Sequence, residues 1–450
     1  MPILYEIKTD PAKGNILVAK RDIQAGELIF NDRHIVLGPK EFGNPKDHCI
    51  SCFKAKASPC LTCELPFCHE GHCSQTHQVE CDTLFQHLKS EPLPLRLALV
   101  APYRLARAMA DDSEHVQTKM EPFMDHEEAR KALTGHQERI AHMRRMIVAV
   151  RPDLEQILNR VFGLLHVNAL DVRNGLGRAL FPTLSYVSHS CVPNSRHIMD
   201  EVDDDGNLHI RLYSQVTIPQ GQEITITYTN LLRHTFARQA ALRRQWFFSC
   251  HCERCSDPTE LKSGINLVYC PSCTKSYLMP DQSEEDVPFW SCLACLKAIS
   301  EDQLQGFLEV LKSKLDAIQP LAIEPLEKFL LYSAQFVHNF HYLCLIAKRY
   351  LSQLYDETDA DQAAKKRLLS HELMIVFDAL DPGYSQSRGL TMIEMVKSDL
   401  ALAEHSQMED PEFQEILKEK IDLVHQCLDV EPKDSLAGEA LKKFNQIIAK

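Results

Sequence analysis

The sequence predicts an α+β protein with a β-rich part, two cysteine-rich segments and an all-helical C-terminal part. Short runs of alternating apolar residues lie in 1–40 and again in 205–230, as is typical of half-buried strands. Most of the 17 cysteines are clustered. From about residue 300 the apolar residues follow helical spacing. A chain of 450 residues is long enough for about two to four compact units.

The composition is that of a globular protein whose main partner is not nucleic acid. The chain is 44% hydrophobic and 25% charged, which argues against wholesale disorder. Its net charge of −13 has the wrong sign for a protein that binds phosphate backbones. The most apolar stretch, Leu93–Ala110, is interrupted by three arginines, so we expect no membrane span. The N-terminus lacks the basic and apolar regions of a signal peptide. We therefore expect an intracellular protein, in the cytoplasm and/or nucleus, with reduced thiols.

The first 40 residues predict two strands, Ile16–Ala19 and Leu28–Phe30, on either side of a turn at Gln24–Glu27. Seven cysteines and a histidine follow within 33 residues. In a reducing compartment such clusters more often bind metal than form disulfides. The paired spacing supplies enough ligands for two tetrahedral zinc sites: Cys49, Cys52, Cys60, Cys63, Cys68, Cys73, His77 and Cys81. His72 stands beside Cys73 and could replace it as a ligand.

The middle of the chain predicts helices over 84–160 and then returns to strands. A β-like segment, Leu184–Val187, precedes the motif Ser188-His189-Ser190-Cys191-Val192-Pro193-Asn194. Further alternation follows at Leu208–Tyr213 and Ile224–Tyr228, separated by a turn at Pro219–Gly221.

Two more cysteine clusters follow these strands. Cys250, Cys252 and Cys255 provide three ligands, and the isolated Cys191 is the natural fourth. The pairs Cys270/Cys273 and Cys292/Cys295 predict a zinc ribbon, although two unrelated turns would share that spacing. Together with the first cluster they provide ligands for four zinc ions. Beyond them, helical spacing such as Leu417, Ile421 and Val424 predicts stacked helix pairs, similar to tetratricopeptide repeats.

The Ser188–Asn194 motif and the segment Gly221–Tyr228 resemble the signature of SET-domain lysine methyltransferases. The first cysteine cluster resembles a MYND zinc finger. A SET domain split by a MYND finger and followed by a post-SET cysteine segment and a helical domain resembles the SMYD family. The extra ribbon is similar to that of the family's arthropod branch. The resemblance implies six parts: 1–48, the N-terminal SET segment; 49–81, the MYND finger; 82–160, a helical insert; 161–249, the SET core; 250–300, the post-SET segment and ribbon; and 301–450, the helical domain.

The resemblance also implies a site that binds S-adenosylmethionine and transfers its methyl group to a lysine of a protein substrate. Tyr228 matches the catalytic tyrosine, although an ordinary strand tyrosine would fit the pattern too. Phe248 matches the aromatic that packs on adenine, or it packs on zinc ligands. Asn194 is expected to tie the fold together. The remaining matches to cofactor-lining positions are Lys13, Asn15, Asn168, Ser185, Val187, Ser188, His189 and Trp246.

Three residues depart from the family pattern: Ile16 replaces a glycine, Ser188 an asparagine and Trp246 a tyrosine. The leading hypothesis is an active protein-lysine methyltransferase. The alternative is a SMYD-fold scaffold with weak or no activity, which regulates transcription through protein contacts. A third, DNA-binding hypothesis is disfavoured by the acidic charge. We expect protein partners at the MYND finger and C-terminal helices, no membrane contact, and a monomer.

Overall fold

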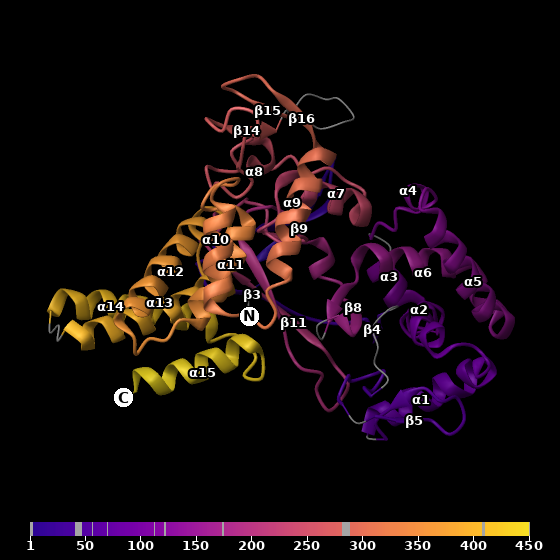
Figure 1. Cartoon of the computed structure of the whole chain (residues 1–450). Coiled ribbons are helices and arrows are strands. Elements are labelled where there is room, and N and C mark those ends of the chain that lie inside the picture. The colour runs from indigo at the N-terminus through magenta and orange to yellow at the C-terminus, as the bar shows by residue number, and fades with distance from the viewer. Residues whose placement is uncertain are drawn as a thin grey trace.

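The computed structural model describes most of the chain. The described residues are 3–40, 47–55, 57–69, 71–111, 113–120, 123–172, 175–280, 289–406 and 410–449. Within these residues no helix is long and apolar enough to cross a membrane. The α+β class is confirmed, with small sheets at the centre and helices around them (Figure 1).

The β-rich part consists of small sheets that join the two ends of the predicted SET region. Strands β3 and β11 pair antiparallel, with β10 beyond β11, and β4 pairs with β8. Strands from before residue 40 therefore pair with strands from after residue 170, so that the two halves fold as one unit. The strands are β1 (Tyr5–Asp10), β2 (Gly14–Ala19), β3 (Leu28–Arg33), β4 (Val36–Pro39), β7 (Leu170–Val172), β8 (Gly177–Leu180), β9 (Ser188–His189), β10 (Ser195–Met199), β11 (His209–Ser214) and β12 (Thr225–Ile226).

One predicted strand is wrong. Leu184–Val187 has a β-like sequence, but Leu184–Tyr186 forms the 3₁₀ helix η4. The carboxylate of Asp32, on β3, accepts hydrogen bonds from the backbone N–H groups of Thr183 (2.6 Å) and Leu184 (3.1 Å). This side chain satisfies the free donors at the start of the turn. Tertiary contact thus overrides the local propensity.

The predicted zinc finger and helical insert pack against the strands in one continuous core. The finger contains β5 (Ser58–Pro59), β6 (Pro66–Phe67) and α1 (Gly71–Thr83). The insert contains η1 (Phe85–Leu88), α2 (Leu93–Asp111), α3 (Ser113–Met120), α4 (Glu127–Arg130), α5 (Thr134–Val150), η2 (Pro152–Leu154) and α6 (Glu155–Asn168). Arg104 of α2 links all three parts, because it binds Glu80 of the finger (2.5 Å) and the carbonyl of Leu37 on β4 (2.6 Å).

The second cysteine-rich region follows the SET strands. It begins with α7 (Thr235–Trp246) and α8 (Glu253–Ser256). A four-stranded antiparallel sheet then has the order β13 (Val268–Tyr269), β14 (Tyr277–Pro280), β15 (Phe289–Cys292), β16 (Ala298–Ser300). The sequential order is that of a meander, as the predicted ribbon requires.

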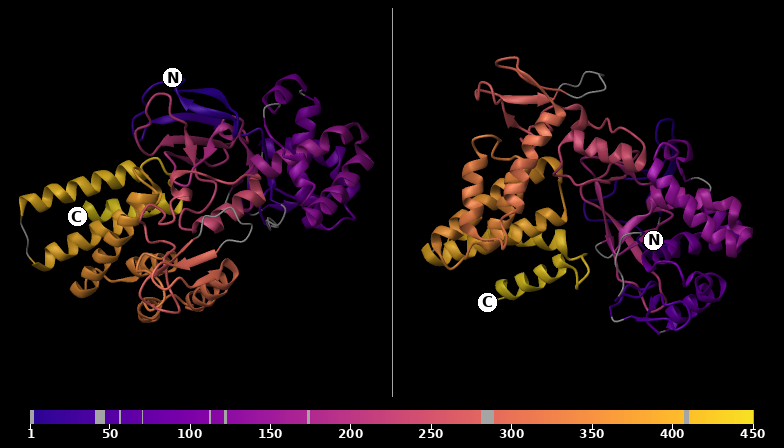
Figure 2. Two further views of the ribbon diagram at one scale, coloured as in Figure 1. Left: turned by 90° about the horizontal axis from the view of Figure 1, so that it is seen from above. Right: turned by 45° about the vertical axis from the view of Figure 1, so that its right-hand side comes forward.

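The C-terminal part is all-helical, as predicted. Ser300 begins it with a capping box, in which its side chain and that of Gln303 exchange hydrogen bonds with the backbone. The helices are α9 (Glu301–Asp316), α10 (Ile323–Ser333), α11 (Tyr342–Leu354), α12 (Ala360–Leu380), α13 (Gln386–Ser406), α14 (Pro411–Leu428) and α15 (Leu436–Ile448). Helices α10–α15 lie on one side of the central strands and α1–α6 on the other (Figures 1 and 2). An ion pair of 3.2 Å between Arg196 of β10 and Glu431, which follows α14, connects the central strands to the C-terminal helices.

Candidate cofactor cavity and metal centres

The sixteen predicted zinc ligands come together in four groups of four. Within each group the ligand atoms lie within 4.8 Å of one another. The groups are Cys49/Cys52/Cys68/Cys73, Cys60/Cys63/His77/Cys81, Cys191/Cys250/Cys252/Cys255 and Cys270/Cys273/Cys292/Cys295. The two groups of the finger interleave along the chain. Cys73 completes the first group, and His72 lies beside it, with its Nε2 3.0 Å from Sγ of Cys73 and its Nδ1 2.9 Å from the carbonyl oxygen of Asp204.

The spacing within the groups fits tetrahedral zinc. Zinc–sulfur bonds of about 2.3 Å at tetrahedral angles place neighbouring sulfurs about 3.8 Å apart. The Sγ–Sγ distance is 3.6 Å for Cys52–Cys68, 4.0 Å for Cys60–Cys81 and 3.5 Å for Cys191–Cys255. A disulfide would bring the sulfurs to about 2.0 Å. The donor set, soft thiolates with one imidazole, is the one that zinc prefers.

The signature segment is threaded against a second segment to form a knot-like crossing. Strand β9 pairs in parallel with β12. The side chain of Asn194 fastens the crossing, since its Nδ2 donates to the carbonyl of Glu223 and its Oδ1 accepts from the N–H of Thr225, both at 2.8 Å. Asn194 is 8% exposed and does not line the cavity described next. Its role is to hold the two segments together, in line with the expectation from the sequence.

A cavity of about 1680 Å³ opens where the SET strands, the insert and α7 meet. All ten positions that the sequence predicts to surround the cofactor line it: Lys13, Asn15, Asn168, Ser185, Val187, Ser188, His189, Tyr228, Trp246 and Phe248. These residues come from segments far apart in the chain, so their convergence depends on the tertiary fold. The volume exceeds the roughly 300–1,000 Å³ of a typical small-molecule pocket.

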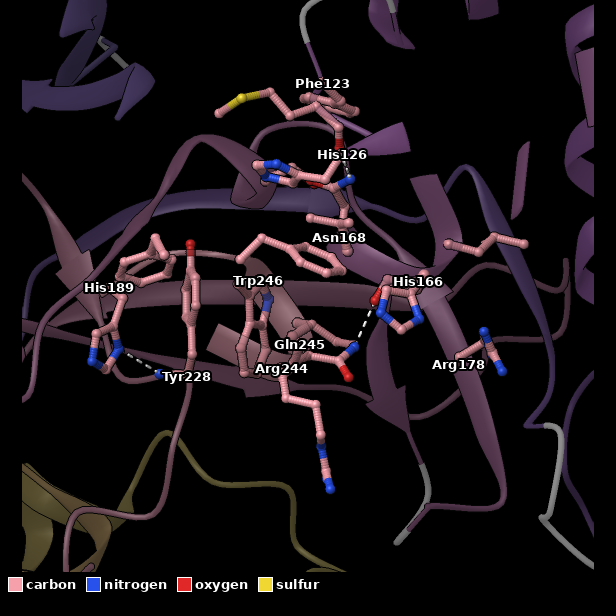
Figure 3. A pocket seen from close by; sticks show the side chains of 18 of the residues that line it. Phe123, His126, His166, Asn168, Arg178, His189, Tyr228, Arg244, Gln245 and Trp246 are labelled. Carbon is pink, nitrogen blue, oxygen red and sulfur yellow. Dashed lines mark hydrogen bonds between the residues drawn. The ribbon is translucent and has the colours of Figure 1, made fainter. Parts of the chain in front are cut away.

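Tyr228 stands at one end of this cavity, between His189 and Trp246 (Figure 3). Its hydroxyl donates a hydrogen bond to the carbonyl oxygen of Val187 at 2.6 Å. Its backbone N–H donates to Nδ1 of His189 at 2.9 Å. Burial, and to a lesser extent the charge of Glu223, raise the pKa of the phenol well above its usual value. The hydroxyl therefore stays protonated at neutral pH.

Comparison with known proteins agrees with this geometry. Residues 14–229 match the family model of the SET domain. SET domain-containing protein SmydA-8, isoform A, of Drosophila melanogaster is 29% identical over 312 residues, covering 65% of this chain and 64% of that protein. Histone-lysine N-methyltransferase ASHR1 of Arabidopsis thaliana is 24% identical (67% and 66%), and N-lysine methyltransferase SMYD2 of Bos taurus is 26% identical (57% and 61%).

Residues 14–229 therefore form a SET domain, and the chain as a whole is similar to SMYD proteins. The match to the fly protein fits the arthropod branch that the ribbon suggested. The matching region spans about two-thirds or less of the length of these relatives.

The three departures from the SMYD pattern lie in different surroundings. Ile16 is 9% exposed and does not line the cavity. Ser188 and Trp246 do line it. The indole ring of Trp246 lies 5.1 Å from the ring of Tyr228, between centroids, at an interplanar angle of 37°. Two of the three departures therefore face the space in which a ligand would bind.

Further residues of this SET-domain chain line the cavity without having been predicted. Phe123, Met124 and His126 reach it from the insert, and the carbonyl of Met124 accepts a hydrogen bond from Asn168 Nδ2 at 3.1 Å. Phe247 ends α7 in the left-handed conformation, with φ 61°. Its ring centroid lies 5.4 Å from that of His126. No motif marks these positions, because each reaches the cavity through packing of an element outside the signature.

The cavity wall is cationic, although the chain is acidic. Its only carboxylate among the described residues is that of Asp171, whose Oδ2 lies 2.5 Å from Nζ of Lys40. Five Lys and Arg side chains line it: Lys13, Lys40, Arg139, Arg178 and Arg244. Arg178 lies beyond His166, at the opposite end from Tyr228 (Figure 3). Two of the five are paired with carboxylates, Lys13 with Glu223 and Lys40 with Asp171, so the excess of positive charge comes from the three arginines.

Proposed function

We propose that this protein is an S-adenosylmethionine-dependent protein-lysine N-methyltransferase. The observation that carries the proposal is the convergence of all ten predicted cofactor positions on one cavity. SMYD-family relatives described as lysine methyltransferases match over more than half of the chain, which supports the same activity.

The lining residues fit the parts of the methyl donor. S-adenosylmethionine supplies an electrophilic methyl group on a sulfonium centre. Lys13, Asn15 and Asn168 offer polar groups to its amino-acid and ribose parts, and Phe248 offers a ring face to adenine. Lys13 is held by Glu223, with Nζ and Oε2 2.6 Å apart. The backbone of His189 would contact the adenine end.

Tyr228 would orient the substrate amine. Because its hydroxyl hydrogen is donated to Val187, the lone pairs of its oxygen are left to accept an N–H from the lysine. Its raised pKa keeps it from acting as a base. A lysine ammonium must lose its proton to become a nucleophile, and burial of the amine beside Tyr228 would lower its pKa. The amine would then take the methyl group in line while the bond from the methyl carbon to sulfur breaks and a neutral thioether leaves, with orientation providing much of the rate gain.

The four cysteine groups would each hold a structural zinc ion, because four ligands leave no open position. The substrate would be a lysine of a protein, and the MYND finger and C-terminal helices would bind protein partners. The thiols of the chain are all free rather than bridged, which supports an intracellular setting in the cytoplasm and/or nucleus. We propose a monomer that binds neither membranes nor nucleic acid directly.

The test is calorimetric titration of the zinc-loaded protein with S-adenosylmethionine, followed by transfer of labelled methyl groups to core histones and to lysate proteins. We expect micromolar binding. Tyr228→Phe should keep most of that binding but lower methyl transfer by about 10²-fold or more, as loss of one oriented hydrogen-bonding group does.

The scaffold alternative predicts a different outcome. Wild-type protein would fail to bind, because Ser188 and Trp246 would have disabled the cavity. Ile16→Gly serves as the control, since Ile16 lies outside the cavity wall and its replacement should not improve binding. A wild type without detectable binding would overturn the proposed function in favour of a protein that acts by holding partners.

A further inference from the structure

The imidazole of His189 connects a metal centre to the proposed catalytic residue. His189 is 8% exposed, and both of its ring nitrogens are engaged. Nε2 lies 3.2 Å from Sγ of Cys191, a member of the third cysteine group. Nδ1 lies 2.9 Å from the backbone nitrogen of Tyr228. The link between Nδ1 and Tyr228 is visible in Figure 3.

The partners decide which nitrogen carries the proton. The backbone N–H of Tyr228 can only donate, so Nδ1 must be the acceptor. The ring hydrogen is then on Nε2, where it points at Cys191 Sγ. A zinc-bound thiolate is an acceptor only, so the two hydrogen bonds require the same tautomer and support each other.

Cys191 also receives hydrogen bonds from arginine side chains outside its group. Its Sγ also accepts a hydrogen bond from Nε of Arg238 at 3.2 Å. Its backbone carbonyl accepts one from Arg254 NH1 at 3.2 Å. Arg238 is fully buried and paired with Glu260. Buried hydrogen bonds therefore hold Cys191 in place, and the imidazole of His189 connects its sulfur to the wall of the cavity.

We propose that His189 is a positioning residue that holds the backbone of Tyr228 at a fixed position relative to the metal centre that contains Cys191. The proposal rests on the proposed function for the role of Tyr228, but not for the link itself. Loss of zinc from this group would release Cys191 and, through His189, Tyr228. The ring would then act in addition to the cofactor contact expected of the backbone of this residue.

Two substitutions each remove one of the two hydrogen bonds of the His189 ring and keep the other. The side-chain amide of asparagine reaches about as far as Nδ1 of histidine, and that of glutamine about as far as Nε2. His189→Asn should therefore keep an acceptor for the Tyr228 N–H and lose the donor to Cys191. His189→Gln should keep the donor to Cys191 and lose the acceptor for Tyr228.

The first readout is amide hydrogen exchange at Tyr228, resolved by mass spectrometry with electron-transfer fragmentation. We expect exchange at Tyr228 to accelerate about tenfold or more in His189→Gln and much less in His189→Asn. The N–H of Thr225, which is held by Asn194, is the internal control and should not change. Accelerated exchange at both positions would mean that the whole crossing had loosened, which would contradict a specific role for the ring.

The second readout is zinc release to a chromophoric chelator. One of the four zinc ions should leave about 10–100-fold faster in His189→Asn, the range seen for lost outer hydrogen bonds to metal ligands, and at the wild-type rate in His189→Gln. In wild-type protein, release of that ion should accelerate exchange at Tyr228. Identical behaviour of the two variants, or unchanged exchange at Tyr228 after zinc loss, would overturn the proposal. Neither readout uses methyl transfer, so failure of the proposed function would be seen separately, as absent binding of S-adenosylmethionine.

Discussion

Glu260 is a fully buried charge whose removal should be costly. Its carboxylate oxygen lies 2.6 Å from Arg238 and 2.8 Å from Arg254, and all three side chains are 0% exposed. It also accepts the N–H of Thr235, which begins α7, at 2.7 Å. Burial alone would raise the pKa of Glu260, but the two guanidinium groups outweigh burial and lower it. The carboxylate is therefore ionised at neutral pH, and it compensates two buried cations.

Glu260→Gln keeps the size of the side chain and removes the charge. Removing one partner from a buried ion pair costs about 3–5 kcal/mol, because the remaining charge is left without compensation. Two arginines share this carboxylate, and Arg238 also contacts Sγ of Cys191, so we expect a loss within that range. The matched control is Glu324→Gln, which breaks the Glu324–Lys328 pair, of similar length at 2.7 Å but with side chains 76% and 71% exposed. An exposed pair one helical turn apart is worth about 0.5 kcal/mol or less.

Native-state hydrogen exchange measures both variants without assuming that a chain of several domains unfolds in one step. The opening free energy of α7 and α8 should fall in Glu260→Gln, and that of α10 should hardly change in Glu324→Gln. A loss below about 1 kcal/mol in Glu260→Gln, or equal losses in the two variants, would refute the view that burial makes this carboxylate essential.

Two further predictions concern the SET core and the insert. Burial lowers the pKa of His34 from 6.5 to about 4, so the unfolded chain binds a proton first and stability falls as pH drops from about 6.5 to about 4. His34→Asn keeps an acceptor for the N–H of Leu208, whose nitrogen lies 3.0 Å from Nδ1 of His34. Without the imidazole, the loss of stability on acidification should be smaller by up to about 3 kcal/mol. Denaturation midpoints of both proteins at pH 7 and 4.5 measure this difference. If both proteins lost equal stability on acidification, His34 would not be the group responsible. Arg104→Lys cannot reproduce the forked contact with Glu80 and should lower the stability of the N-terminal half by about 2–3 kcal/mol. Arg107→Lys, at an exposed pair, is its control in the same denaturation series and should change little; equal losses in the two would contradict a linking role for Arg104.

The four groups of candidate metal ligands could be predicted from the sequence because their chemistry depends on local spacing. A CxxC pair fixes two ligands on one turn, and only a partner pair is needed to complete the site. Cys191 is distant in the chain from Cys250, Cys252 and Cys255, and it could be assigned to them only because three cysteines need a fourth ligand to complete a tetrahedral site. The interleaving of the two groups in the finger could not be read in this way, since several pairings of eight ligands satisfy the same count.

The cavity could be predicted only in part, for a physical reason. Signature residues such as Tyr228 are fixed by the crossing of two segments, and that crossing has a sequence pattern. His126 and Phe247 enter the cavity because helices of the insert and α7 pack beside it. Packing of separate elements depends on shape complementarity over many residues, which leaves no short motif.

Ile16 departs from the Gly-x-Gly pattern at a position where the structure does not require glycine. Successive residues of a strand point to opposite faces, and in β2 Asn15 lines the cavity whereas Ile16 is buried away from it. The extended backbone of Ile16 pairs with Lys8 in the hairpin, so no left-handed conformation is needed there. Gly14 is the position that needs one, with φ +78°, and a Cβ there would lie 3.2 Å from Cε of Met124. The requirement for glycine at this edge of the cavity therefore falls on Gly14, and β2 accommodates isoleucine at the second position without narrowing the cavity.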